Sequence, residues 1–249
     1  MRKVVRLGPR LAMAAEMAGS AETIWDIGCD HGYLAAALAA GGAAEHIVAS
    51  DISPASVIKT ERLIERLGLK NTVRVINADG LNGFEPQGEY KLVFCGMGGE
   101  LIAEMLQNSA DIAHAAKLIV MQPMRGEEEL RSFLCQNGYG ITAEKAVCDD
   151  GRYYQLIAAA YGPGIPRPEW FPEGHYRFGW VMCLEPDENV IGLIKGFREG
   201  HAKRLHKAVS FGRTPPMLVK ELAEVDTILT YLAAHGSVRA GEAGGEQHA

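Results

Sequence analysis

The residues best suited to chemistry lie in one short segment, residues 26–34, which reads Asp-Ile-Gly-Cys-Asp-His-Gly-Tyr-Leu. An apolar run ends there in a turn that contains Gly28 and Gly32, and an alanine-rich helical segment follows over residues 34–40. A strand, a glycine turn and a helix in this order are typical of a site for a nucleotide-type cofactor. We therefore predict that five residues of this segment bind the cofactor, namely Asp26, Gly28, Asp30, His31 and Gly32.

Asp30 distinguishes this turn from one that binds a dinucleotide. It stands where the second glycine of a G-x-G-x-x-G turn would lie, and a carboxylate at that point repels a pyrophosphate. The same carboxylate tolerates a cofactor with a net positive charge and no phosphate, such as S-adenosylmethionine. The turn therefore indicates methyl transfer and argues against a dehydrogenase. Asp30 is also a catalytic candidate, because it could stabilise the positive charge that passes onto an acceptor ring.

Two further acids are placed to bind a nucleoside. Asp51 ends the second apolar run, where an acid can accept hydrogen bonds from both ribose hydroxyls. The alternative role of an N-cap is better filled by Ser53. Asp79 precedes Gly80 after the third predicted strand, and it can accept from the adenine amine, although Asp-Gly alone is an ordinary turn. Because they come at the ends of the strands that follow the first turn, Asp51, Asp79 and Gly80 are predicted to bind the cofactor together with it.

A glycine-rich loop follows the fourth predicted strand and reads Gly96-Met97-Gly98-Gly99. Ligands of open parallel sheets bind outside the carboxyl ends of the strands. Glycines at this point would let a ring or a methyl group lie against bare backbone. We predict that Gly96 and Met97 bind the cofactor and that Gly98 belongs to the catalytic centre, while Met97 packs on adenine or reaches the core.

The chain lacks one motif that would specify a different methyl acceptor. No Asn/Asp-Pro-Pro-Tyr/Phe string follows the fourth predicted strand, as it does in enzymes that methylate the amine of adenine or cytosine. Adenine N1 needs neither a strong base nor a covalent catalyst, because its lone pair is available and alignment can suffice. Gln122, which Pro123 follows, could hold a flipped base by its edge and is a second catalytic candidate.

Tyr33, in the first turn, either caps the predicted cofactor pocket or packs beneath it.

The bulk composition is that of a soluble globular protein, with 249 residues, 47% apolar and 22% charged. Five scattered cysteines without a C-x-x-C pair predict reduced thiols in a cytoplasmic protein and no metal site. Cys29 could be a nucleophile, but the simpler interpretation is a small side chain that fills space beside the turn. No apolar run reaches membrane-spanning length and no signal peptide is evident. We expect no membrane association and no obligate protein partner.

Charge is distributed unevenly although the net charge is −6. Basic residues without acids among them occur near the N-terminus, where Arg10 is the last, and a second basic cluster includes Lys203, Arg204 and Lys207. The clusters are either solvated faces or patches that bind a polyanion. We predict that these four residues contact RNA.

The pattern of apolar runs predicts alternating strands and helices. Strands are expected over residues 23–27, 46–52, 72–76, 91–95 and 117–121, and helices over residues 9–17, 34–40, 54–67, 100–107 and 127–136. Strand-like runs 141–147 and 153–161 are joined by an Asp-Asp-Gly-Arg turn, which signals a hairpin. This predicts an α/β, Rossmann-like sheet, mostly parallel with an antiparallel hairpin at its C-terminal end, as in class I methyltransferases.

A stiff Pro/Gly connector over residues 162–168 predicts a domain boundary. We expect a cofactor-binding methyltransferase domain over residues 1–162 and a small α-helical, coiled-coil-like domain over residues 169–236, with helices over residues 187–210 and 216–234. Residues 240–249 are Gly-rich and polar, which predicts a disordered tail.

These motifs together resemble the bacterial tRNA (adenine(22)-N1)-methyltransferase family over about two-thirds of the chain. The resemblance rests on seven strings, which are Arg10-Leu11, residues 26–34, Asp51-Ile52, Asp79-Gly80-Leu81, residues 96–99, Gln122-Pro123 and residues 150–154. It implies a class I methyltransferase domain with S-adenosylmethionine as cofactor, a helical C-terminal domain that helps to hold tRNA, and roles for Ile52 in cofactor binding and for Arg10, Tyr33, Gln122 and Pro123 in substrate binding.

The sequence thus predicts an S-adenosylmethionine-dependent enzyme that methylates N1 of an adenine in tRNA. Position 22 follows from the family resemblance alone. Two alternatives stay open: a methyltransferase with a small-molecule acceptor, and a non-catalytic S-adenosylmethionine-binding module with a helical arm that binds a partner protein. A small-molecule methyltransferase has no use for the basic cluster on the predicted C-terminal helices. A non-catalytic module predicts affinity for the cofactor without a methyl acceptor in RNA.

Overall fold

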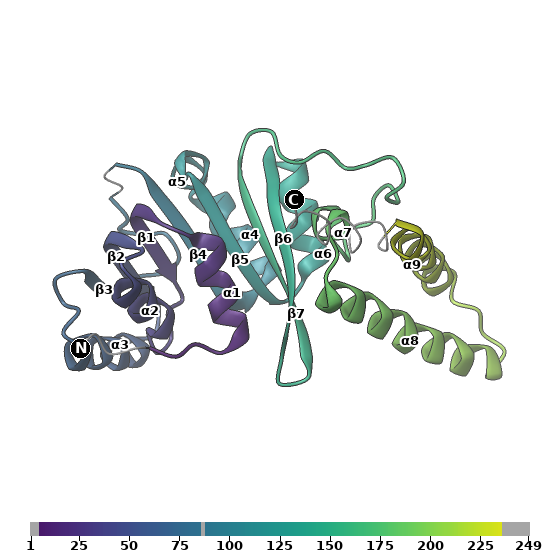
Figure 1. Ribbon diagram of the computed structural model, residues 1–249, viewed down its shortest axis with the longest axis horizontal. Coiled ribbons are helices and arrows are strands. Elements are labelled where there is room, and N and C mark those ends of the chain that lie inside the picture. Colours follow the sequence, from purple (N-terminus) through teal and green to yellow (C-terminus); the bar gives the residue numbers. More distant parts are fainter. Residues whose placement is uncertain (1–4, 86–87, 236–249) are drawn as a thin grey trace, which may run out of the picture. The chain divides into compact units, whose positions relative to one another are not determined.

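Seven strands form one sheet, which organises the larger part of the chain (Figure 1). The computed structural model describes residues 5–85 and 88–235. The strands are β1 (Ala21–Ile27), β2 (Ala44–Asp51), β3 (Val73–Asn77), β4 (Tyr90–Gly98), β5 (Leu118–Arg125), β6 (Tyr139–Asp149) and β7 (Arg152–Tyr161). Strands β1 to β5 run parallel, and β7 is antiparallel to both β5 and β6. The predicted parallel sheet with a C-terminal hairpin is confirmed.

The strand order, β3-β2-β1-β4-β5-β7-β6, reverses direction between β1 and β4. These strands are neighbours although β2 and β3 lie between them in the sequence. Ligands of open α/β sheets bind at such a reversal, outside the carboxyl ends of the strands. The turn that begins at Gly28 leaves β1 there, and the glycine-rich segment at residues 96–99, predicted as a loop, forms the end of β4 and the first residue of α4. The topology therefore brings the two predicted cofactor segments together.

Helices cover both faces of the sheet, as continuous apolar strands require. Helix α1 (Pro9–Ala18) contacts α2 (Tyr33–Gly41), which contacts α3 (Pro54–Leu67), on one face. Helix α4 (Gly99–Asn108) contacts α5 (Ala110–Ala115) and α6 (Glu127–Gln136) on the other. Figure 1 shows α1 in front of the sheet and α4 and α6 behind it.

The helix and strand boundaries follow from local chemistry. Helix α3 begins after Ser53, whose Oγ accepts a hydrogen bond from Ser56 N at 3.4 Å, and ends before Gly68 in the left-handed conformation. The predicted helix over residues 54–67 is confirmed at both ends. Helix α5 was not predicted, because its six residues, which directly follow α4, are too short for a periodic pattern.

The core contains a buried ion pair as well as apolar side chains. Trp25, Phe94 and Leu92 are fully buried in the middle of the sheet. Arg131 of α6 is equally buried and donates to Glu144 Oε1 of β6 at 2.7 Å and to Gln155 Oε1 of β7 at 2.8 Å. Removing one member of such a pair leaves an uncompensated charge, at a cost of about 3–5 kcal/mol. The pair therefore fixes α6 against the hairpin.

A second compact unit, Pro166–Ala249, follows the sheet unit, Met1–Ile165. It contains α7 (Trp180–Leu184), α8 (Glu188–Ser210) and α9 (Pro216–His235). Asp187 caps α8 by accepting from Val190 N at 2.8 Å. Helices α8 and α9 pack against each other, with Arg198 paired to Asp226. The predicted helices are confirmed, α7 was not predicted, and the tail at residues 240–249 lies outside the described residues.

The described residues contain neither a membrane-spanning helix nor a cluster of metal-binding side chains. None of the helices within residues 5–85 and 88–235 is long and apolar enough to cross a membrane. The same residues contain no group of three or more His, Cys, Asp or Glu side chains that could hold a metal ion.

Candidate active site

The turn after β1 is held in an unusual backbone conformation. Asp30 has φ of +49°, and Gly28 and Gly32 have φ of +72° and +70°. A Cβ on Gly32 would lie 2.4 Å from Cγ2 of Thr60 in α3, so glycine is required there both for its conformation and for space. The hydroxyl of Thr60 also donates to the carbonyl oxygen of Asp30 at 3.1 Å. Helix α3 therefore fixes the shape of the turn, in which the Asp30 side chain is exposed.

Asp51 ties the turn to the end of β2. Its Oδ2 accepts from Asp30 N at 3.0 Å and its Oδ1 accepts from Ser53 N at 2.8 Å. Asn77, at the end of β3, donates to the carbonyl oxygens of Asp51 and Ile52. Each carboxylate oxygen of Asp51 keeps a further lone pair. The side chain is thus rigid and still able to accept two ligand hydroxyls.

Asp26 is the buried acid of the site. It is 2% exposed, and its Oδ2 accepts from Ala35 N at 3.2 Å, which connects β1 to the first turn of α2. The pKa of Asp26 is raised to about 7, chiefly by burial and in smaller part by the charge of nearby Asp51, while the hydrogen bond from Ala35 N lowers it. A cation bound in the cavity would favour the ionised form of this carboxylate.

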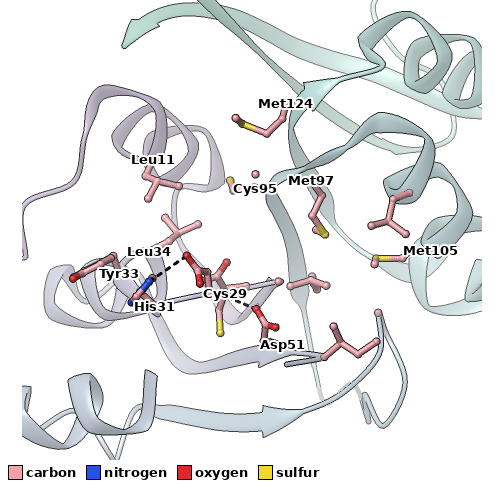
Figure 2. A pocket seen from close by; sticks show the side chains of 18 of the residues that line it. Leu11, Cys29, His31, Tyr33, Leu34, Asp51, Cys95, Met97, Met105 and Met124 are labelled. Atoms are coloured by element: carbon pink, nitrogen blue, oxygen red, sulfur yellow. Dashed lines mark hydrogen bonds and ion pairs between the residues drawn. The ribbon is translucent and has the colours of Figure 1, made fainter. Parts of the chain in front are cut away.

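A cavity of about 480 Å³ lies between these segments at the carboxyl edge of the sheet. Four carboxylates line it, namely those of Asp26, Asp30, Asp51 and Asp79, against one guanidinium, that of Arg10. Figure 2 shows Met97, Met105 and Met124 on one side and Leu11, Tyr33 and Leu34 on the other. The cavity therefore combines apolar walls with a negative floor, which suits an organic cation.

The glycine-rich segment at the end of β4 forms the wall on that side. Gly96 has φ of +83°, and its N–H donates to Gln122 Oε1 at 3.2 Å. A Cβ on Gly99 would lie 2.0 Å from the carbonyl oxygen of Gly126, so only glycine lets α4 begin this close to β5 and α6. Gly98 contributes no lining to the cavity. Glycine is thus needed at both ends of this segment, and the catalytic role of Gly98 stays a prediction.

Gln122 lies under the wall of the cavity. It is 0% exposed, its Oε1 also accepts from Arg10 Nη1, and its Nε2 donates to the carbonyl oxygen of Pro123 at 2.7 Å. Its amide is therefore engaged with the protein on both sides. The structure places Gln122 as a support for Arg10 and Gly96, and its predicted contact with an acceptor base stays a prediction.

Most of the predicted site residues come together at this cavity. Twelve of them line it, namely Arg10, Asp26, Gly28, Asp30, His31, Tyr33, Asp51, Ile52, Asp79, Gly80, Gly96 and Met97. Gly32, Gly98, Gln122 and Pro123 lie outside its lining. Lys203, Arg204 and Lys207 are exposed on α8 of the second unit. Their predicted contact with RNA stays a prediction.

Sequence reasoning missed the contribution of α4. Leu101 and Met105 line the cavity from this helix, and Leu101 is 44% exposed. Their spacing of four residues places them on one helix face directly after the glycine-rich loop. That spacing was the signal that could have identified them.

Comparison with known proteins settles the family. Residues 7–157, more than half of the chain, match the methyltransferase domain family. The chain belongs to that family. The methyltransferase prediction is thereby confirmed. Among curated relatives, a Bacillus subtilis tRNA (adenine(22)-N(1))-methyltransferase is 27% identical over 238 residues, which cover 93% of this chain and 99% of the relative.

Solved structures share the fold of this methyltransferase. A Streptococcus pneumoniae protein in complex with S-adenosyl-L-methionine aligns with a TM-score of 0.77 and 24% identity, over 88% of this chain and 98% of that one. TrmK of M. capricolum, in complex with S-adenosyl-homocysteine, aligns with a TM-score of 0.73 and 20% identity, over 91% and 98%. The Rossmann-like fold and its C-terminal helices are thus shared along nearly the whole chain.

The thiols of the methyltransferase site lack the lowered pKa that activates a nucleophilic cysteine. Burial raises the pKa of Cys29 to about 12, and the charge of Asp26 contributes, while Sγ lies 3.5 Å from Thr60 Oγ1. Burial also raises the pKa of Cys95 well above its ordinary value. Because the thiolate is the reactive form, neither thiol is activated, and Cys29 is a small buried side chain while Cys95 is half-buried.

Proposed function

We propose that this methyltransferase transfers the methyl group of S-adenosylmethionine to N1 of an adenine in tRNA, at position 22. The observation that supports S-adenosylmethionine as the cofactor is the set of four carboxylates that line the cavity, where the strand order reverses between β1 and β4. A phosphorylated cofactor would be repelled by them, whereas a sulfonium with an ammonium group is attracted. The acceptor is supported by the B. subtilis relative, which matches along both chains.

The residues present fit S-adenosylmethionine part by part. Asp51 has free lone pairs for the two ribose hydroxyls. Ile52 is 65% exposed at the cavity, so it offers an apolar surface to one face of the adenine ring. Asp79, which is exposed beside Gly80, can accept from the adenine amine. Asp26 and Asp30 lie nearest the turn, where the positively charged end would be held.

The cofactor supplies an electrophilic methyl group on a sulfonium. Adenine N1 attacks that carbon with its ring lone pair, so an N–C bond forms as the S–C bond breaks, and the positive charge passes from sulfur to the ring. No proton must be removed before attack, which agrees with a site whose two thiols have raised pKa values. The protein then contributes alignment and electrostatics. We propose that Asp30, which is exposed at the cavity, stabilises the charge on the ring.

Access to N1 requires the nucleotide to leave its stack or its base pair, because N1 lies on the pairing edge. Tyr33 is 47% exposed at the cavity and offers a ring for the extruded base. We propose that Arg10 and the exposed α8 residues Lys203, Arg204 and Lys207 bind phosphates, which makes binding sensitive to salt. Such an enzyme works where tRNA is found, in the cytoplasm.

The test is methylation of unmodified tRNA with labelled S-adenosylmethionine, followed by primer extension. We expect label on tRNA and a halt of the polymerase at one position, because a methyl group on N1 blocks pairing. Label without a halt would mean a different acceptor atom. No label on any RNA, with intact cofactor binding, would refute the proposal in favour of a small-molecule acceptor or a non-catalytic module.

A further inference from the structure

The hairpin between β6 and β7 ends beside the cavity. Because β6 runs parallel to β5, its carboxyl end lies at the same sheet edge as the carboxyl end of β5. Figure 1 shows this end of the hairpin projecting beyond the sheet. Arg152 begins β7 at the hairpin turn, and its Nη2 donates to the carbonyl oxygen of Met124, a residue that lines the cavity, at 2.9 Å. Arg152 is therefore a residue of the cavity rim.

Two arginines from distant parts of the chain meet on one aromatic ring at this rim. The guanidinium carbon of Arg152 lies 5.1 Å from the centre of the Tyr154 ring, and that of Arg10 lies 5.7 Å from the same centre. Arg10 belongs to α1, lines the cavity and donates to Gln122. Stacking on a ring fixes the plane of a guanidinium but leaves its N–H groups free to bind another group.

Two arginines, Arg10 and Arg152, stand at the rim beside the acids of the hairpin turn, Asp149 and Asp150, whereas four carboxylates line the cavity itself. Within residues 5–85 and 88–235, no carboxylate forms an ion pair with Arg10 or Arg152. The neighbouring Asp149 meets Arg10 through the backbone, where its Oδ2 accepts from Arg10 N at 3.5 Å. Two guanidinium groups held close together on one ring, neither in an ion pair within the described residues, are suited to an external anion, and a planar fork suits a phosphate.

We propose that Arg152 and Arg10, held on Tyr154, form a clamp for backbone phosphates that flank the target nucleotide. The clamp rests on the proposed function, and it adds Arg152 as a binding residue and the hairpin as an RNA-contacting element. A nucleotide taken out of its stack must have its backbone held while the base enters the site. A clamp at the rim holds the backbone outside while the base reaches the methyl donor, which binds at the negative floor.

The test compares Arg152→Ala, Arg152→Lys and the control Arg74→Ala in the full chain. Arg74 is an exposed arginine on β3, at the opposite edge of the sheet. For Arg152→Ala we expect the KM for tRNA to rise about ten- to hundredfold, as for a lost hydrogen bond to a charged group. The slope of log Kd for tRNA against log salt should fall by about one, and the Kd for S-adenosylmethionine should stay unchanged. Arg152→Lys should keep the wild-type slope, and Arg74→Ala should match wild type in all three measurements.

Three results would overturn the clamp. The first is an unchanged salt slope in Arg152→Ala, and the second is an equal loss of slope in Arg152→Lys. The third is a parallel loss of S-adenosylmethionine binding, which would make Arg152 a support for Met124. If the wild-type protein methylates tRNA and one of these is found, only the clamp fails. If the wild-type protein transfers no methyl group to tRNA, the proposed function and the clamp fail together.

Discussion

Asp26 makes the stability of this protein depend on pH in a way that one substitution isolates. Its carboxyl is buried, and its pKa rises from an ordinary value of 3.8 to about 7. The folded protein therefore binds this proton more tightly than the unfolded chain does. The resulting stability is fully present below pH 3.8 and is lost as pH rises to about 7. Above that value the ionised, buried carboxylate is a constant penalty.

The size of this change in unfolding free energy follows from the difference between the two pKa values of Asp26. At about 1.36 kcal/mol per pH unit, the range from 3.8 to about 7 corresponds to on the order of 4 kcal/mol. Other carboxyl groups titrate in this range, so the measurement is a difference. Asp26→Asn keeps an acceptor for Ala35 N and cannot ionise. Relative to this variant, the wild-type free energy of unfolding should fall by about 4 kcal/mol between pH 3.8 and 7 and then level off.

Urea unfolding of both proteins at a series of pH values measures the difference directly. S-adenosylmethionine gives the complementary result, because a cation favours ionised Asp26. Its affinity for the wild-type protein should rise as pH increases through about 7, and its affinity for Asp26→Asn should be flat over the same range. A difference in unfolding free energy that does not change with pH would refute the reasoning, because Asp26 would then titrate alike in the folded and unfolded states.

Three further predictions follow from single contacts. Gly32→Ala places a Cβ 2.4 Å from Thr60 Cγ2 at positive φ, so we expect loss of S-adenosylmethionine binding by calorimetry and destabilisation of about 1–3 kcal/mol. Wild-type affinity would contradict this. Ile52→Ala removes an exposed cavity side chain and should weaken S-adenosylmethionine roughly tenfold with an unchanged Tm. A Tm loss instead would assign Ile52 to the core. Glu144→Gln should lower the free energy of unfolding in urea by about 3–5 kcal/mol, because the buried charge of Arg131 loses its counter-ion. The double variant Arg131→Met/Glu144→Leu should recover much of that loss.

The fold was predictable because its signals are local. A glycine turn after an apolar run, the Ser53 cap of α3 and the Asp-Gly turn of the hairpin each act over a few residues. The strand ends were less predictable. Strand β4 continues through Gly98, three residues past its predicted end, because pairing with β5 continues there with register shifts. Pairing of this kind depends on the neighbouring strand, which local sequence does not contain.

The site residues divide in the same way. The acids at Asp26, Asp30, Asp51 and Asp79 were recognisable because each lies at or just beyond the carboxyl end of a strand in a parallel sheet, and these ends share one edge. Leu101 and Met105 were missed because an apolar helical pair usually faces the core. Only the structure shows that Leu101 is exposed at the cavity.

The sequence by itself therefore determined the type of chemistry, since the charge of the turn and the alternation of strands and helices are properties of adjacent residues. The tertiary structure decided which of these groups face the ligand. Arg10 and Gln122 meet across 112 positions in the chain, and Arg10 and Arg152 meet on Tyr154. The burial that moves the pKa of Asp26 to about 7 comes from packing around it. Contacts of this range exist only after the sheet has formed, because packing brings these distant parts of the chain together.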